Sequence, residues 1–244
     1  MKSFLLMLTF LTRIPIPITF EFDEKTFIKG VVYFPIIGVI IGGLLSLITL
    51  FNPFLPREYL NFLIIVAYLI IVGGLHIDGL ADVCDGIFSC RKKERVFEIM
   101  SDSLVGTFGV IALVLYFLGL YIFLEPSFKV VFAFPIVGRV MGLFVSGVFR
   151  YAKETGMGKA MVDSATYVTA IGAVVFGSII TFLLGEIIFI AFILTLIMSY
   201  IIAQRINRFL GGITGDVIGC VIEVSQVIFL IFIAIGGVLW TYIS

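Results

Sequence analysis

The sequence contains few charged residues and very few histidines or cysteines. Of its 244 residues, 13% are charged and one is histidine, whereas soluble domains are about 25% charged. The formal net charge is zero, which argues against the basic surface of a nucleic-acid-binding protein. Cys84, Cys90 and Cys220 show neither disulfide nor zinc spacing, so we expect reduced thiols.

Apolar residues are correspondingly abundant, at 61% of the chain with a mean hydropathy of +1.23. So short a chain cannot bury this much apolar surface alone, so lipid must cover part of it. A membrane span needs about 20 apolar residues. Seven stretches qualify, at about 31–51, 59–77, 105–124, 128–149, 167–184, 186–203 and 223–243. The short join at Gly185-Glu186 leaves six or eight spans as alternatives.

Basic residues are distributed unevenly between the loops. The N-terminal tail holds four lysines and arginines, and the segments 78–104, 150–166 and 204–217 hold four, three and two. The alternate loops hold only Arg57 and Lys129. Because short cytoplasmic loops carry the excess of Lys and Arg, we expect the N-terminus and these segments on the cytoplasmic side of the cell membrane.

These features predict an all-α fold, a polytopic transmembrane helical bundle of about seven spans with a cytoplasmic N-terminus. No repeat or linker divides the chain, so we expect one membrane domain over 1–244, with an interfacial segment at 1–30 and the bundle at 31–243. Residues 3–12 are predicted to form a short interfacial or re-entrant helix. We expect this segment to be retained because it has no small-residue cleavage site.

The segment GGLHIDGLADVCDG, residues 73–86, carries the most informative pattern. Asp78, Asp82 and Asp85 are spaced i, i+4 and i+7, which places them along one face of a helix. Like charges at this spacing repel one another, and a cation would relieve the repulsion. Carboxylates at a membrane edge suit Mg²⁺, which also binds substrate phosphates. The alternative is that they are solvated acids on an interfacial helix.

Further polar islands lie on the same predicted side. Asp102 and Ser103 precede a predicted span, where they could cap a helix or bind an anion. The segment RYAKETGMGK, residues 150–159, could bind phosphate or simply anchor the chain. Gly211 to Asp216 form a polar turn before the last span. Acids for a metal, basic residues for phosphates and flexible glycines on one face together predict a phosphoryl or nucleotidyl transferase.

Arg139 and Glu223 fall within predicted spans, where ionisable residues are candidates for function.

Five segments, in order along the chain, resemble the cobalamin synthase (adenosylcobinamide-GDP ribazoletransferase) family. They are FLTRIPIP at 10–17, GGLHIDGLADVCDG at 73–86, ERVFEIMSDSLVGTFG at 94–109, RYAKETGMG at 150–158 and GGITGDVIG at 211–219. The resemblance implies a membrane-bound, Mg²⁺-dependent enzyme of coenzyme B12 biosynthesis. A hydroxyl of α-ribazole, or of its 5′-phosphate, would attack adenosylcobinamide-GDP and release GMP to give adenosylcobalamin or its 5′-phosphate. Besides its substrates, the protein is expected to contact membrane lipid and not nucleic acid. Assembly into a homo-oligomer is an open alternative.

The resemblance also assigns residues. Asp78, Asp82 and Asp85 would hold Mg²⁺ on the diphosphate, with Asp82 and Asp85 counted as catalytic. Asp102, the third catalytic residue, would complete the metal shell or act as base, and Asp216 would bind metal or ribazole. The substrate-binding set is Arg13, His76, Ser103, Arg139, Lys153, Thr214 and Asp216.

Two positions depart from the family pattern. Leu104 stands where a basic residue often follows Asp-Ser, and Gln226 stands where a second acid often follows Glu223. Two other functions compete with this interpretation. A CDP-alcohol phosphatidyltransferase-like enzyme also uses an Asp cluster at the membrane edge, but its motif has Arg where Asp82 stands. A transporter would place its site near the bilayer midplane, often within repeats.

Overall fold

The computed structural model describes residues 1–17 and 23–243, with only the backbone for Met157 and residues 239–243. Residues 18–22 of the predicted N-terminal segment and Ser244 lie outside the described residues. The elements are α1 Lys2–Leu11, α2 Glu24–Gly30, η1 Val31–Tyr33, α3 Phe34–Ser46, η2 Leu47–Phe51, α4 Arg57–Val72, α5 Leu75–Phe88, α6 Lys93–Ile99, α7 Thr107–Phe123, α8 Phe128–Val148, α9 Met157–Ser164, α10 Tyr167–Leu184, α11 Glu186–Leu210 and α12 Gly215–Ile243. The described residues form no β-strand, which confirms the predicted all-α class.

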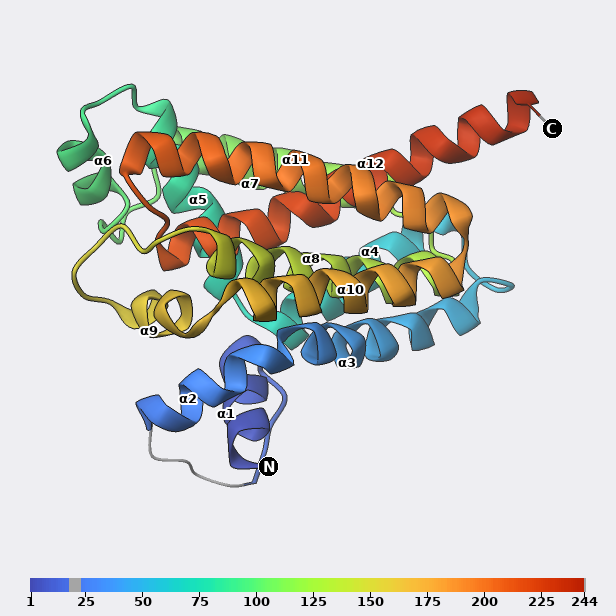
Figure 1. Ribbon diagram of the computed structural model, residues 1–244. Helices are drawn as coiled ribbons and strands as arrows, with labels where there is room; N and C mark the ends of the chain where they lie inside the picture. Colours follow the sequence, from blue (N-terminus) through green and yellow to red (C-terminus); the bar gives the residue numbers. More distant parts are fainter. Residues whose placement is uncertain (18–22, 244) are drawn as a thin grey trace.

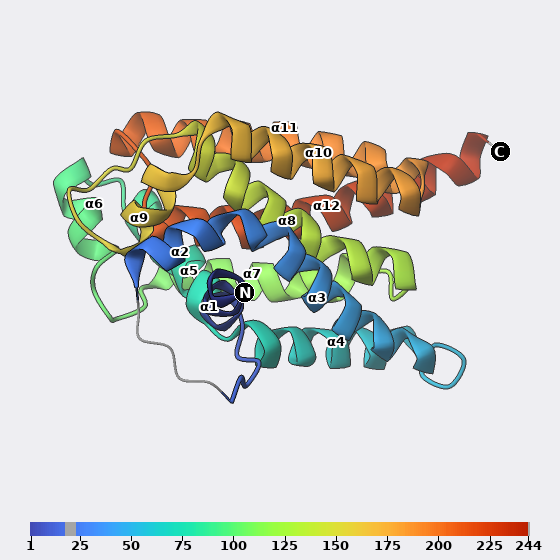
Figure 2. The ribbon, with the colours of Figure 1, turned by 60° about the horizontal axis from the view of Figure 1, so that its bottom comes forward.

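The long helices run side by side as a bundle (Figures 1 and 2). Five segments are long and apolar enough to span a membrane: Glu24–Phe51, Phe128–Val148, Tyr167–Leu184, Glu186–Leu210 and Gly215–Val238. The bent pair α4–α5 gives a sixth candidate. The seventh predicted span, α7, is shorter, with 17 residues and a length of about 26 Å. The chain is thus a polytopic membrane bundle, with five or six clear spans where seven were predicted.

The predicted span at 59–77 is broken. α4 ends at Val72, and α5 begins at Leu75 after a bend of 96°. Gly73 makes this bend possible because its φ of +67° is a conformation that L side chains rarely adopt. The carboxylate-bearing helix α5 therefore does not continue the span but turns across the end of the bundle.

The polar segments gather at one end of the bundle. Figures 1 and 2 both show α2, α5, α6 and α9 at this end, with the C-terminus of the chain at the other. Hereafter this is called the polar end. All the segments predicted to share one side of the membrane meet here. α12 begins eight residues before the predicted start of the last span, so Asp216 lies in its first turn and not in a loop.

Small residues bring the central helices close together. A Cβ on Gly42 of α3 would collide with the backbone of Phe132 on α8, and one on Gly142 of α8 would lie 2.6 Å from Ile222 of α12. Close backbone packing at small residues is how helices associate in lipid, where burial of apolar surface gives little driving force. α3, α8 and α12 therefore form a closely packed core, and α5 packs against its α12 helix.

Candidate active site

α5 crosses the start of α12 with its backbone in direct contact. A Cβ on Gly79 would lie 2.8 Å from the carbonyl oxygen of Asp216, and one on Gly219 would lie 3.0 Å from the Cα of His76. Only glycine fits at such a crossing. The contact brings Asp216, which is 134–138 residues away along the chain, up to Asp78 and Asp82 of α5.

Asp78, Asp82 and Asp216, here called the acidic group, influence one another electrostatically. Asp78 is exposed, and Asp82 and Asp216 are partly buried. Burial, together with the negative charges of neighbouring acids including Asp78 and Asp216, raises the pKa of the Asp82 carboxyl to about 7, although the nearby Lys153 ammonium acts in the opposite direction. A carboxyl whose pKa is raised by burial and by neighbouring acids is a candidate for a functional site.

Asp85 is placed differently from the other acids of α5. It is buried, and its carboxylate oxygens accept hydrogen bonds from the backbone N–H of Gly106 at 2.7 Å and of Gly109 at 2.8 Å. These amides belong to the first turn of α7, so Asp85 caps that helix from another element. In this arrangement both oxygens are already used by α7, and its predicted role as a metal ligand and catalytic residue stays a prediction.

No group of three or more His, Cys, Asp or Glu side chains in the described part of the chain is arranged to hold a metal ion. The three acids of α5 therefore do not form a ready-made cage. Mg²⁺ seldom uses such a cage in proteins, because it keeps several waters and binds through one or two carboxylates together with substrate phosphates. The acidic group fits a cation of that kind.

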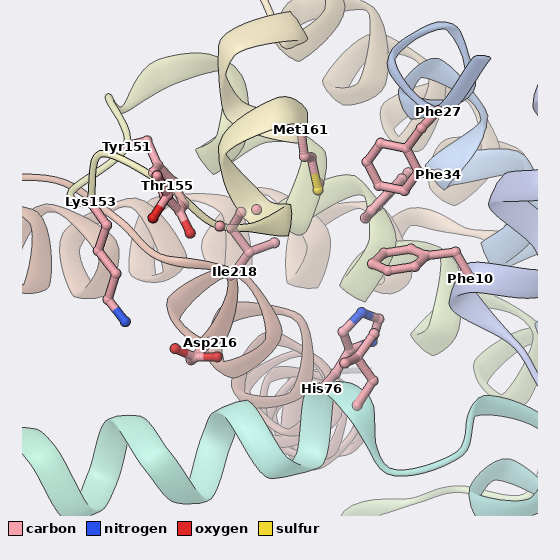
Figure 3. Close-up of a pocket in the computed structure, with 14 residues that line it drawn as sticks. Phe10, Phe27, Phe34, His76, Tyr151, Lys153, Thr155, Met161, Asp216 and Ile218 are labelled. Carbon is pink, nitrogen blue, oxygen red and sulfur yellow. The ribbon is translucent and has the colours of Figure 1, made fainter. Parts of the chain in front are cut away.

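Beside the acidic group lies a cavity of about 250 Å³. Figure 3 shows side chains from several elements converging on it. Its lining residues are Phe10, Phe27, Phe34, Leu75, His76, Tyr151, Lys153, Thr155, Gly156, Gly158, Met161, Gly215, Asp216 and Ile218. Three of the predicted site residues, His76, Lys153 and Asp216, are thereby brought together. Asp216 belongs both to the cavity and to the acidic group.

The loop carrying Lys153 is held against the turn before α12. Tyr151 and Ile213 form a parallel bridge, with the N–H of Ala152 donating to Ile213 at 2.9 Å. A Cβ on Gly212 would lie 2.7 Å from the Cα of Ala152, so this approach requires glycine. The Lys153 ammonium reaches Ser101 Oγ at 3.4 Å. Burial and the charge of Asp216 raise the pKa of Tyr151.

Three other predicted residues lie on exposed surfaces of the polar end. Asp102 and Ser103 are exposed, and Asp102 accepts the N–H of Leu104 at 3.1 Å within its own turn. Arg13 packs on the bend between α4 and α5, and with Asp78 it lines a second depression of about 470 Å³. Arg13 and Asp78 therefore share an open surface, whereas neither Asp102 nor Ser103 lines the cavity.

Arg139, a predicted substrate-binding residue, and Glu223, which was predicted only as a functional candidate within a span, are both buried and do not line the cavity. Arg139 is 0% exposed and donates to the Tyr68 hydroxyl at 3.1 Å. Glu223 accepts hydrogen bonds from Tyr68, Tyr116 and Gln226. We call these five residues the buried polar cluster; its members come from α4, α7, α8 and α12.

Thr214 is also buried, with 1% of its surface exposed, and its hydroxyl accepts the N–H of Val217 at 3.3 Å. It therefore caps the start of α12, and the same hydroxyl contacts Asp216 at 3.2 Å. In this position Thr214 orients Asp216, and its predicted contact with substrate stays a prediction.

The sequence matches the profile of the cobalamin-5-phosphate synthase family over residues 3–234. The chain belongs to this family. A relative from Alkaliphilus oremlandii named adenosylcobinamide-GDP ribazoletransferase is 41% identical, with the match covering 95% of this chain and 96% of the relative. Proteins of the same name from Acetivibrio thermocellus and Fusobacterium nucleatum are 36% and 34% identical, covering 95% and 94% of this chain and 96% of each relative. No solved structure matches. The predicted family and enzyme class are confirmed.

Several residues of the cavity were not predicted from the sequence. Tyr151 and Thr155 lie inside the segment RYAKETGMGK, so that motif pointed to the right loop but only Lys153 was selected from it. Phe10, Phe27 and Phe34 carried no usable signal, because the chain contains 26 phenylalanines and most predicted helices contain several.

Proposed function

We propose that this enzyme joins adenosylcobinamide-GDP to α-ribazole, or to its 5′-phosphate, at the cytoplasmic face of the cell membrane. A hydroxyl of the acceptor attacks the phosphorus bonded to cobinamide, a new P–O bond forms, and the bond to the GMP oxygen breaks. The products are adenosylcobalamin, or its 5′-phosphate, and GMP. The observation that carries the proposal is the acidic group beside a cavity that contains Lys153, within a chain whose relatives bear this enzyme's name.

The residues of the site have three roles in this reaction: they bind phosphate, orient the acceptor hydroxyl and accept its proton. The Lys153 ammonium, which faces both Asp82 and Asp216, is placed to contact a phosphate oxygen. Asp216 lies where the cavity meets the acidic group, so its carboxylate can orient the acceptor hydroxyl. The hydroxyl proton leaves to a carboxylate of the acidic group. Arg13 on the open side of Asp78 is available to the donor's phosphates.

Mg²⁺ fits this chemistry. One or two carboxylates of the acidic group, which comes from two helices, would hold the ion, and the diphosphate of the donor would complete the coordination. When bound, the cation neutralises charge on the diphosphate and on the departing GMP. The cation also offsets the repulsion within the acidic group, so we expect cation and donor to bind cooperatively.

The distribution of basic residues supports the proposed orientation of the protein in the membrane. Thirteen basic residues lie in the segments at or leading into the polar end: four in the N-terminal tail, four in 78–104, three in 150–166 and two in 204–217. The alternate loops contain only Arg57 and Lys129. The excess of basic residues on the cytoplasmic side of membrane proteins supports a polar end that faces the cytoplasm. Cytosolic nucleotide substrates would then reach the acidic group directly.

Purified protein in detergent tests the proposal. With adenosylcobinamide-GDP, α-ribazole and Mg²⁺ it should release GMP, and omission of α-ribazole or addition of a chelator should stop the release. Absence of GMP under all conditions would reject the proposed reaction. A matched assay in proteoliposomes measures substrate flux, because flux without GMP release would favour a transporter.

A further inference from the structure

The cavity beside the acidic group has two chemically different ends, and the proposed reaction uses only one of them. Figure 3 shows Phe10, Phe27 and Phe34 gathered at one end, with Lys153 and Asp216 at the other. The three rings come from α1, α2 and α3, the first three α-helices of the chain. Such a convergence of aromatic side chains on one end of a cavity is suited to an apolar, flat ligand.

The three phenylalanines at the aromatic end differ in how much of their surface is exposed. Phe27 and Phe34 are buried, with 2% and 1% of their surface exposed. Phe10 is only partly buried; its ring packs edge-on against Phe27, with centroids 5.1 Å apart and an interplanar angle of 90°. Phe10 is therefore the ring that a ligand can cover, while the buried Phe27 ring packs against it.

We infer that this cavity binds the acceptor nucleoside, with its fused aromatic base against Phe10 and its ribose directed toward Lys153 and Asp216. The inference rests on the proposed function for the identity of the two substrates. α-Ribazole carries a dimethylated benzimidazole, which is flat and largely apolar. Guanine, the other base in the reaction, has several hydrogen-bonding groups on its edge, and an end lined by three phenylalanines, with His76 as the polar side chain beside Phe10, would leave most of them unpaired.

This orientation connects the cavity to the reacting phosphate. With the base at the aromatic end, the ribose hydroxyls lie at the polar end, where Asp216 belongs to both the cavity and the acidic group. The donor's diphosphate is proposed to bind at that acidic group. The nucleophile therefore emerges from the cavity beside the phosphorus that it attacks.

Removal of the Phe10 ring tests the inference. Stacking of a base on an aromatic side chain corresponds to about a 5- to 150-fold change in affinity. Phe10→Ala should therefore raise the KM for α-ribazole by a factor in this range and leave the KM for adenosylcobinamide-GDP unchanged. Phe4→Ala is the matched control, because Phe4 lies on the same helix and packs edge-on against Tyr33 outside the cavity. Both KM values should stay unchanged in that variant.

A second measurement uses the unaltered protein, so it does not depend on the folding of a variant. Free 5,6-dimethylbenzimidazole should inhibit competitively with α-ribazole and not with the donor. An unchanged KM for α-ribazole in Phe10→Ala, a raised KM for the donor, or competition of the free base with the donor would each overturn the inference. In all three cases wild-type GMP release would still support the proposed reaction, whereas its absence would reject that reaction itself.

Discussion

The Oδ1 of Asp85 accepts a hydrogen bond of 2.8 Å from the backbone N–H of Gly109. This contact joins two segments that both belong to the family-like motifs, the acidic block on α5 and the Gly-x-x-Gly at the start of α7. A Cβ on Gly106 would lie 2.5 Å from Asp85 Oδ1, and one on Gly109 would collide with the same carboxylate. Both glycines therefore make room for the Asp85 cap.

Replacement of Gly109 by alanine should destabilise the protein. The added methyl group displaces the Asp85 carboxylate from the buried helix end, and the loss of such a cap costs about 1–2 kcal/mol. Thermal unfolding in detergent measures the effect. Gly172→Ala on α10 is the control, because no atom lies within 4 Å of its added Cβ; alanine there should be neutral or stabilising by up to about 1 kcal/mol. Equal stability of the two variants would contradict the proposed cap.

The buried polar cluster should be sensitive to the loss of its acid. Glu223 is the acidic member of a cluster in which the Nε and Nη2 of Arg139 have no hydrogen-bond partner among the described residues. Glu223→Ala would leave the Arg139 charge uncompensated, at a cost of about 3–5 kcal/mol. Glu98→Ala, which removes an exposed partner of Arg95, should change stability by less than about 1 kcal/mol.

A double variant separates charge from packing in this cluster. If the cost of Glu223→Ala comes from an uncompensated charge, Arg139→Met combined with Glu223→Leu should recover most of the lost stability. The unfolding midpoints of the single and double variants show whether stability is recovered. A double variant that is less stable than Glu223→Ala would show that the cluster stabilises the bundle through specific hydrogen bonds.

The raised pKa of Asp82 predicts a pH-dependent stability. In the folded protein burial, followed by the charges of Asp78 and Asp216, raises this pKa from 3.8 to about 7. The contribution of Asp82 to stability is therefore complete below about pH 4 and is lost as the pH rises through about 7. Asp82→Asn does not titrate, so it should gain stability relative to wild type between pH 4 and pH 8. Unfolding measured in the presence of a chelator tests this, and a difference independent of pH would contradict it.

Chemical labelling of a native cysteine can show which side of the membrane the polar end faces. Cys90 is exposed between α5 and α6, whereas Cys84 is partly buried and Cys220 is buried. A membrane-impermeant maleimide should label Cys90 in inverted membrane vesicles and not in intact cells. Glu125→Cys in a Cys90→Ser background should show the opposite pattern, because Glu125 lies between α7 and α8 at the other end. Labelling of Cys90 from outside would contradict a cytoplasmic site.

Local sequence patterns predicted the helices well because each depends on a continuous apolar run. The predicted span at 167–184 matches α10, and 128–149 matches α8 to within one residue. The bend after Val72 could not be predicted in this way, since the apolar pattern continues through it and the bend depends on the backbone conformation of Gly73. The early start of α12 was missed because its first turns contain glycine and Asp216.

The site was predictable in part for the same reason. The spacing of Asp78, Asp82 and Asp85 correctly placed all three on one helix, but it could not show what each carboxylate contacts. The partners of Asp85 are backbone amides more than 20 residues away along the chain, and those of Asp82 include Asp216. Contacts between distant segments are set by helix crossings, and a single sequence does not reveal them.

GMP release by carboxylate variants tests most directly whether the acidic group performs the reaction. Asp82→Asn and Asp216→Asn should each lower the rate by at least about a hundredfold at saturating Mg²⁺. Asp163→Asn, which removes an exposed partner of Lys159 on α9, should retain the wild-type rate. Full turnover by Asp82→Asn would contradict a catalytic acidic group formed by α5 and α12.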